Sequence, residues 1–398
     1  MTAKGATDLS RGQYGVRTAM YHGGDAAELA ACAAALAEGG EHALLLVFFD
    51  PGFDAADLGT RLKLQLDVPW QICCSTAGGL SPLGYVEGGA AILLFEAEAF
   101  AAMGAVVPHV ADGALEAGAE IARELRARFD RETAGRSAHG GGPLALCLVD
   151  GLSNQEETVV AAFDAVLSDI PLVGGSAGDR SAFRAASLVL DGRVHRNAAI
   201  LCLLWSDLPF RIFKSDHFEP TRTRLVVTGC DPDRRLVTGL NGAPAAEEYA
   251  TVLGLDPLGL DRFSFAAYPV VVRIGGEHYC RSIRSVEAEG LTFFCAVEEG
   301  IVLTLARSRD MVGALRETLS AVSRDLGGIA LVLGFDCILR RVEAEQRQLG
   351  RRLAEVFDEF NVIGFTSYGE QYRAMHLNQT FTGVAFGRPG AALREAAE

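Results

Sequence analysis

Residues 144–179, LALCLVDGLSNQEETVVAAFDAVLSDIPLVGGSAGD, contain the unit from which the fold can be predicted. LALCLVD at 144–150 is a continuous apolar run with the length of a buried strand. SNQEETVVAAFDAVLSD at 153–169 has helical spacing behind polar residues that favour a helix start. IPLVGGSAGD at 170–179 predicts a second strand that ends in a turn of small residues. The stretch therefore predicts a strand–helix–strand unit.

This unit occurs three times along the chain, each time followed by a further apolar strand. Such self-similarity indicates a repeated supersecondary unit, and buried strands in every copy imply layered α/β packing. The copies consist of HALLLVFFD (42–50), DAADLGTRLKLQL (54–66), VPWQICCSTAGG (68–79) and GGAAILLFEA (88–97); of residues 144–179 with RNAAILCLLW (196–205); and of GIALVLGFDC (328–337), RRVEAEQRQLGRRLAEVFDEF (340–360), NVIGFTSYGEQ (361–371) and FTGVAFG (381–387).

Residues 215–325 differ from the copies around them. They contain short strand-like runs with glycine-containing turns, such as RLVVTG, PVVVRIGG and LTFFCAVEEG. Runs of this kind predict an antiparallel sheet. The fold class that we predict is α/β and α+β, with repeated strand–helix–strand–strand units in layered packing and an antiparallel sheet. We expect an N-terminal α/β domain at 1–210 and a C-terminal α+β domain at 211–398.

One turn of the repeat matches a catalytic pattern. Gly174, Ser176 and Gly178 fit G-x-S-x-G, in which a strained turn exposes a serine nucleophile. Ser75 and Ser367 occupy the corresponding turns of the other copies without completing the pattern, and glycine suits a compact strand exit without any chemistry. We therefore predict structural turns with the three serines at comparable strand ends, and a serine hydrolase is the less favoured alternative.

Charge and hydropathy exclude several classes of protein. The chain has 51 acidic and 36 basic residues and a net charge of -15, so a nucleic-acid-binding face would oppose the average field of the protein. No apolar run approaches the length of a membrane span, and the N-terminus has no apolar core of a signal peptide. We expect a cytoplasmic protein without membrane insertion and without nucleic acid as a partner.

The predicted N-terminal α/β half, followed by four stretches further along the chain, resembles the FIST family of bacterial sensory proteins, and the resemblance covers about residues 40–210 and 220–387. The last two stretches are also similar to the nitric-oxide-sensing NosP branch of that family. The four stretches are LNGAPAAEEY (240–249), YCRSIRS (279–285), GFDCILRR (334–341) and YGEQYRAMHLNQTFTGVAFG (368–387).

The resemblance implies a protein that holds non-covalent haem b, binds nitric oxide and regulates a partner histidine kinase, with consequences for cyclic-di-GMP and biofilm signalling. It does not imply an enzyme, and the sequence contains no kinase, cyclase or phosphodiesterase motif. A sensor of this kind acts by contact. The identity of the kinase, the sign of its regulation and the choice between monomer and homodimer stay open.

A nitric-oxide sensor needs a breakable axial bond to the haem iron, which neutral imidazole provides. Of the eight histidines, we favour His376 as the iron ligand because it lies in the NosP-like stretch between apolar neighbours. His217 and His278 are the alternatives, and Tyr372 and Cys337 also stay open. The other histidines lie at expected element ends, turns or linkers; they are His22, His42, His109, His139 and His195.

Arg340 and Arg341 follow a buried strand, together with Asp336 and Glu343. One interpretation is an ion-pair cluster that fixes the turn from strand to helix. The other is a binding site, because the planar guanidinium suits a carboxylate of haem or of an amino acid.

The turn and return strand of the third copy are rich in polar residues where the first two copies have small or apolar ones. This enrichment predicts a ligand pocket or an interface. A haem-free module that binds an amino-acid-like metabolite near Arg340 is therefore our second hypothesis. The polar residues are Tyr368, Glu370, Gln371, Asn378 and Gln379.

Overall fold

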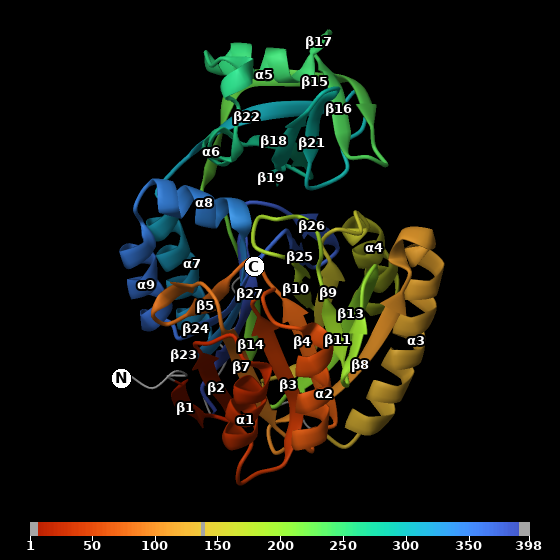
Figure 1. The fold of residues 1–398 in the computed structure, drawn as a ribbon, viewed down its shortest axis with the longest axis vertical. Coiled ribbons are helices and arrows are strands. Elements are labelled where there is room, and N and C mark those ends of the chain that lie inside the picture. Colours follow the sequence, from red (N-terminus) through yellow and green to blue (C-terminus); the bar gives the residue numbers. More distant parts are fainter. Residues whose placement is uncertain (1–6, 137–139, 390–398) are drawn as a thin grey trace.

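The computed structural model describes residues 7–136 and 140–389, and one of the candidate histidines, His139, lies outside them. Two parts are visible in Figure 1. Residues 218–308, called the module below, lie at one end of the molecule. All other described residues form the body. None of the helices in these described ranges has the length and apolarity needed to cross a bilayer.

The body contains the three predicted units, and in each the first two strands are parallel. The helix expected at 340–360 is two helices, because Gln348 between them adopts a positive φ of 56°. The first unit comprises β3 (His42–Phe49), α2 (Ala55–Gln65), β4 (Trp70–Ser75) and β7 (Ala90–Glu96); the second comprises β9 (Gly142–Asp150), α4 (Glu156–Leu167), β10 (Leu172–Ala177) and β13 (Ala198–Ser206); the third comprises β23 (Ile329–Cys337), α8 (Ile338–Gln346), α9 (Gly350–Glu359), β24 (Val362–Ser367) and β27 (Phe381–Gly387).

Each unit also gives a short hairpin to another unit. The first unit's hairpin pairs with β24 of the third, the second unit's hairpin pairs with β4 of the first, and the third unit's hairpin pairs with β10 of the second. The exchange is cyclic, so the units are related by an approximate threefold arrangement. The hairpins are β5 (Gly79–Ser81) with β6 (Gly84–Val86), β11 (Leu188–Leu190) with β12 (Arg193–His195), and β25 (Glu370–Tyr372) with β26 (Met375–Leu377).

A ring of backbone hydrogen bonds closes this exchange at the ends of the second strands. Ser75 and Ser176 have equivalent places in the ring, as predicted. Ser367 does not, because Thr366 takes the third place and the serine lies one residue later. The bonds run from Gly178 N to Ser75 O at 3.0 Å, from Tyr368 N to Ser176 O at 3.2 Å, and from Ala77 N to Thr366 O at 2.9 Å.

Apolar side chains from all three units fill the centre of the body, between the sheets. Leu46, Leu146 and Leu333 lie in equivalent strands of this core, and helices cover the outer faces. The remaining elements of the body are β1 (Thr7–Gln13), β2 (Val16–Tyr21), α1 (Ala26–Leu36), β8 (Phe100–Pro108), a 3-10 turn (Val110–Asp112), α3 (Ala114–Thr133), β14 (Phe210–Ser215) and α7 (Met311–Asp325).

The module has an eight-stranded sheet, and all its strand pairs are antiparallel, as predicted for this region. It faces the end of the body where α4 and α8 begin. The domain boundary expected near residue 210 stays a prediction. The module's elements are β15 (Phe218–Asp231), β16 (Leu236–Leu240), β17 (Ala243–Pro244), α5 (Ala245–Leu253), a 3-10 turn (Pro257–Gly259), α6 (Arg262–Ala267), β18 (Val270–Ile274), β19 (Glu277–Arg281), β20 (Ile283–Glu287), β21 (Gly290–Phe293) and β22 (Val302–Ser308).

Candidate functional site

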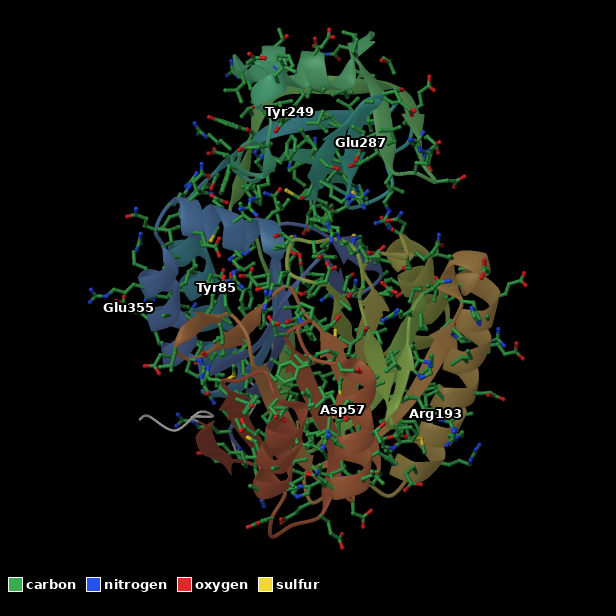
Figure 2. All side chains as sticks on the ribbon, viewed as in Figure 1. Asp57, Tyr85, Arg193, Tyr249, Glu287 and Glu355 are labelled. Carbon is green, nitrogen blue, oxygen red and sulfur yellow. The ribbon has the colours of Figure 1, made fainter. Side chains whose placement is uncertain are left out.

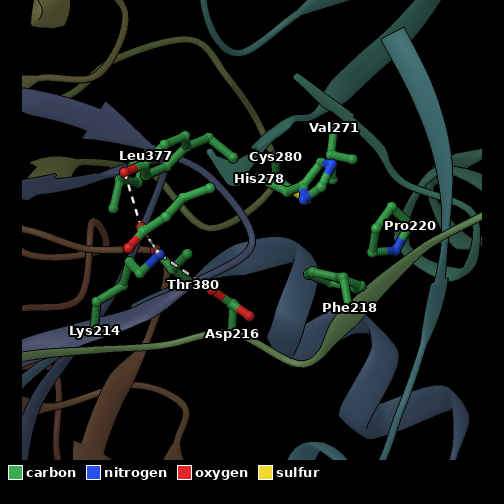
Figure 3. Close-up of a pocket in the computed structure, with 11 residues that line it drawn as sticks. Lys214, Asp216, Phe218, Pro220, Val271, His278, Cys280, Leu377 and Thr380 are labelled. Carbon is green, nitrogen blue, oxygen red and sulfur yellow. Dashed lines mark hydrogen bonds and ion pairs between the residues drawn. The ribbon is translucent and has the colours of Figure 1, made fainter. Parts of the chain in front are cut away.

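A cavity of about 380 Å³, called the junction pocket below, lies where the module meets the third unit. Its walls come from β14 and the start of β15, from β18 and β19, and from the stretch around β26 (Figure 3). The lining is mixed, with charged, aromatic and aliphatic side chains. The lining residues are Lys214, Asp216, Phe218, Pro220, Val271, Glu277, His278, Tyr279, Cys280, Leu377 and Thr380.

Opposite charges meet in this pocket. The ammonium of Lys214 lies 3.2 Å from Asp216 Oδ2 and 3.8 Å from Glu277 Oε2. It also lies 4.9 Å from the centre of the Tyr279 ring, at the distance of a cation–π contact. The pocket therefore offers a cation for a ligand carboxylate and carboxylates for a ligand ammonium.

His278 is half-buried and lines both the junction pocket and a neighbouring groove of about 980 Å³. It lies directly opposite Arg273 in the pairing of β18 and β19. The groove also contains Arg222, Arg224 and Arg281. None of its four arginines forms a salt bridge within the described ranges, and Glu298 is the one acidic residue of the lining, so basic side chains outnumber acidic ones in the groove.

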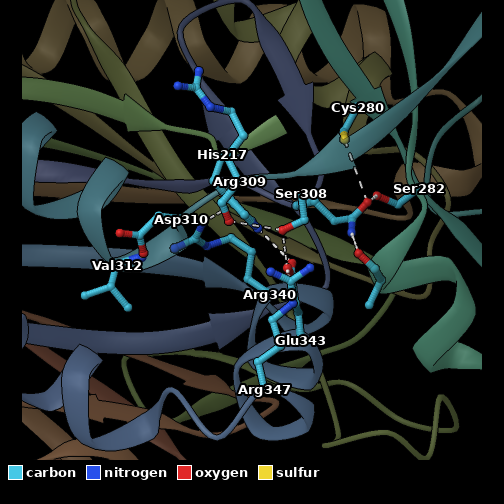
Figure 4. A network of polar contacts seen from close by, with 12 residues as sticks. His217, Cys280, Ser282, Ser308, Arg309, Asp310, Val312, Arg340, Glu343 and Arg347 are labelled. Atoms are coloured by element: carbon cyan, nitrogen blue, oxygen red, sulfur yellow. Dashed lines mark hydrogen bonds and ion pairs between the residues drawn. The ribbon is translucent and has the colours of Figure 1, made fainter. Parts of the chain in front are cut away.

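Arg340 lies in a buried polar network beside the pocket (Figure 4) and is itself fully buried. Its Nε donates to Asp336 Oδ1 at 2.6 Å, and the Tyr85 hydroxyl donates to Asp336 Oδ2 at 2.5 Å. Figure 2 labels Tyr85 beside the helices of the third unit. The network thus matches the ion-pair interpretation of Arg340. Arg341 lies outside the network and lines a different cavity, described below.

His217 links this network to the module. Arg340 Nη1 donates to His217 Nδ1 at 2.8 Å, so the other ring nitrogen carries the proton and donates to Glu343 Oε2 at 2.7 Å. The Ser308 hydroxyl donates to the same carboxylate. Burial lowers the pKa of His217, which agrees with a neutral ring. Both ring nitrogens are engaged.

His376 is enclosed where the third unit's hairpin meets the module. Its Nε2 lies 3.4 Å from the carbonyl oxygen of Phe294, and its Nδ1 lies 3.4 Å from Gln371 Nε2. A Cβ on Gly369 would lie 2.1 Å from the ring, so glycine is needed for the ring to lie there. His376 lines neither the junction pocket nor the neighbouring groove.

The other polar residues of the third unit hold the hairpin to its neighbours. Gln371 donates to Ser176 of the second unit at 3.0 Å, and Asn378 lies 3.5 Å from the His376 ring. The Tyr368 hydroxyl donates to Asp179. Gln379 accepts from Ser282 at 2.9 Å and donates to the carbonyl of Ala266 at 3.1 Å, both in the module. The polar enrichment thus builds contacts between the units and the module.

Ser176 lies inside β10 and is fully buried. Its hydroxyl accepts the hydrogen bond from Gln371, and its φ is not in the positive range that a strained nucleophile turn would show. Ser176 is therefore a strand residue whose hydroxyl links the second unit to the third.

Glu370 joins the junction pocket to the interior of the third unit. Its carboxyl group accepts from the hydroxyls of Ser367 at 2.6 Å and of Thr380 at 2.7 Å, and Thr380 lines the pocket. Burial raises the pKa of Glu370 to about 8, and the charge of Asp336 adds to this. A pKa of about 8 favours the protonated form of Glu370 at neutral pH.

This pKa gives a testable pH dependence. Because the pKa of Glu370 is about 8 in the folded protein and near the ordinary value of 4.5 in the unfolded chain, stability should fall as pH rises between these values. Replacing Glu370 with Gln should make the loss of unfolding free energy from pH 5 to pH 8 smaller by roughly 2 kcal/mol or more. Urea unfolding at several pH values measures this, with exposed Glu355→Gln as control. Equal slopes in the two variants would contradict it.

The candidate haem ligands differ in their access to a cavity. His217 uses both ring nitrogens in the network, and an iron at His376 would require displacement of its close neighbours. His278 alone among these three faces cavities on two sides, with apolar walls and unpaired arginines that suit propionates. The residues around His278 therefore fit haem. In the described ranges, no group of three or more His, Cys, Asp or Glu side chains is arranged to bind a bare metal ion.

Sequence reasoning missed Lys214, Asp216 and Tyr279. Lys214 lies near the end of β14 and Asp216 just after it, whereas Tyr279 lies in β19 of the module; the three side chains meet only because β14 ends beside β19. A usable signal existed for the first of these, because only three lysines occur in the chain and one of them lies near the end of a strand.

Comparisons with known proteins cover nearly the whole described chain. The model of the FIST N domain matches residues 43–243, and that of the FIST C domain matches residues 245–373. Over 360 residues the chain is 24% identical to the uncharacterized protein MJ1623 of Methanocaldococcus jannaschii. The aligned region covers 82% of this chain and 69% of that protein. These matches concern the family and do not address the NosP branch, haem or nitric oxide.

Proposed function

The chain belongs to the FIST family, and on that premise we propose that it senses a small zwitterionic metabolite of the amino-acid class in the junction pocket. As a FIST-domain protein it is a sensory module. The observation that carries the choice of ligand is the meeting of Lys214 with Asp216 and Glu277 on the wall of one cavity. A carboxylate would pair with the ammonium of Lys214, and a ligand ammonium would pair with the two acids.

The size and position of the pocket support this proposal. About 380 Å³ is within the range of small-molecule sites, and such sites often lie between domains. A ligand there would contact the module through β19 and the body through β14 and Thr380. A ligand that contacts both parts shifts their relative position by its difference in affinity for the two arrangements.

The output that we propose is contact with a partner protein, without an enzymatic step in this chain. The resemblance to the nitric-oxide-sensing branch favours a histidine kinase as that partner. Occupancy of the pocket would reach the buried polar side chains by two routes. One runs from Thr380 to Glu370, and the other runs from Asp216 to its neighbour His217.

Replacing Lys214 with Met should weaken binding of the ligand at least tenfold, since Met keeps the length of the side chain and removes the charge that pairs with the carboxylate. Calorimetric titration of the purified protein with each standard amino acid, and with its decarboxylated analogue, measures this. Lys63→Met, at an exposed position of α2, is the control. The proposal fails if no amino acid binds, or if the Lys214 variant binds as tightly as the control.

Haem with nitric oxide is the second candidate, and the exposure of His278 to both cavities favours it. Haem would supply an iron that binds the gas, His278 would hold it, and the unpaired arginines would pair with the propionates. Absorption spectra with and without hemin, before and after nitric oxide, separate the two candidates. A Soret band that is lost in His278→Ala and kept in His376→Ala supports His278 as the residue that binds the haem iron. A band that is lost in His376→Ala and kept in His278→Ala supports His376 instead.

A further inference from the structure

A second cavity, of about 480 Å³, lies on the other side of α8 from the buried network and is called the seam pocket below. It adjoins the place where the hairpin of the first unit packs on the third. Residues of all three units and of the module line it. They are Asp50, Ala77, Gly78, Glu87, Gly88, Arg180, Ser181, Arg262, Ile338, Arg341, Val342 and Glu345.

The seam pocket lies at the carboxyl ends of parallel strands. Asp50 follows β3, Gly78 follows β4, Arg180 follows β10, and Arg341 is in the helix that follows β23. Ligands of open α/β sheets bind in crevices at this edge, because the connections leave the sheet there in different directions. The fold therefore places this cavity where α/β proteins bind ligands.

Arg341 is held in a defined position on the wall of the pocket. Its side chain is only 9% exposed, and its Nη1 donates to the carbonyl of Ala77 at 3.3 Å. Gly78 has a φ of +134°, and a Cβ there would lie 1.9 Å from the same nitrogen. Only glycine at position 78 leaves room for the guanidinium of Arg341.

The carboxylates that pair with Arg341 are exchangeable. Glu87 lies 2.7 Å from Nη2 and is 82% exposed, and Glu345 lies 2.9 Å from Nε and is 53% exposed. Ion pairs with such exposed partners contribute little to stability because water screens them. A ligand anion in the pocket can replace Glu87 at the guanidinium with little loss.

Arg262 brings a further positive charge from the module. It is exposed, stacks on Phe263 at 5.0 Å, and forms no salt bridge with any residue in the described part of the chain. Arg180 is also present, although Asp50 holds it with two hydrogen bonds of 2.7 and 2.9 Å. Two guanidiniums from different parts of the protein, Arg262 and Arg341, are thus available to one ligand.

We propose that the seam pocket binds a small oxyanion with at least two negative charges, a phosphate or a dicarboxylate, between Arg262 and Arg341. The planar fork of each guanidinium matches the paired oxygens of such a group. Because one arginine belongs to the module and the other to the body, the bound anion ties the two parts together. This site is separate from the junction pocket and does not depend on the function proposed for it.

Calorimetric titration at low ionic strength with inorganic pyrophosphate and, separately, with succinate tests the proposal. We expect one of these probes, or both, to bind at one site per chain. Arg262→Ala should weaken the binding at least tenfold, whereas Glu87→Gln should tighten it because it removes the competing carboxylate. Arg351→Ala, at a 93% exposed position of α9, is the control. Lys214→Met should leave this binding unchanged, which separates it from the junction pocket.

Binding of pyrophosphate alone assigns the site to phosphates, and binding of succinate alone assigns it to dicarboxylates. Binding of both supports the shared chemistry. The proposal is overturned if neither probe binds, or if Arg262→Ala and Arg351→Ala bind with the same affinity. Since Arg262 is exposed, its loss does not threaten folding, and a null result there cannot be ascribed to a misfolded protein.

Discussion

Replacing Arg340 with Met should lower the free energy of unfolding by roughly 3–5 kcal/mol. The variant leaves the carboxylate of Asp336 buried with Tyr85 as its remaining partner and removes the donor to His217 Nδ1. A buried charge without its counter-ion is far more costly than the loss of an exposed pair, because water cannot replace the lost contact. Urea unfolding followed by circular dichroism measures the change.

Arg347→Met is the matched control for Arg340. It directly follows α8, its side chain is 42% exposed, and it lies 3.2 Å from the same Glu343 that His217 contacts. Its loss should cost less than about 1 kcal/mol. The double variant Asp336→Leu with Arg340→Met should recover part of the stability, because it removes both charges. If Arg340→Met and Arg347→Met are equally stable, the network does not stabilise the fold in this way.

The three units could be predicted from the sequence because their strands are continuous apolar runs in a repeated order. The exchange of hairpins could not. Each hairpin strand, such as β5 or β25, has three residues, which is too short for a periodic pattern, and its partner strand lies in another unit. The one-residue offset of Ser367 has the same origin, since the ring of hydrogen bonds is a property of three units together.

The candidate site was predictable to the extent that it depends on local enrichment. Polar residues of the third unit stood out because the other copies lack them, and Gln371 and Gln379 do form contacts between units and with the module. The partners of His376 and His217 were not predictable, because a lone histidine gives no sign of which distant carbonyl or carboxylate it will meet. The junction pocket is likewise produced by elements that are remote along the chain.

Two of the contacts between the module and the body differ in how their charges are paired. On the side of the second unit, the module inserts Arg235 between Glu156 and Glu157 at the start of α4. On the side of the first unit, Arg262 approaches Arg341 across the seam pocket, and no carboxylate of the described residues lies between them as a salt-bridge partner of Arg262. In the first contact, the protein supplies both the positive and the negative charges. In the second, a ligand anion would supply the negative charge.

Replacing Arg235 with Asn should release this first contact and lower the free energy of unfolding by roughly 3–5 kcal/mol. Arg235 is 3% exposed, its Nη2 lies 2.6 Å from the buried Glu156, and its Nη1 donates to the carbonyl of Phe294. Its φ is 51°, so Asn is chosen because Asn tolerates this conformation and the variant adds little backbone strain. Without the guanidinium, the Glu156 carboxylate stays buried and unpaired.

The loss should be greatest where the module meets the body, and this distinguishes release of the contact from a general loss of stability. The amide of Ala296 donates to Glu157 Oε1 at 3.0 Å, so hydrogen exchange of that amide should accelerate more than exchange in the central strands of the body. Arg234→Asn is the control, since Arg234 is the neighbour of Arg235, is exposed and pairs with exposed Glu289. Uniform acceleration in every strand would mean that Arg235 supports the whole fold, and unchanged exchange at Ala296 would mean that the module is held to the body by other contacts, with Gln379 the first to examine.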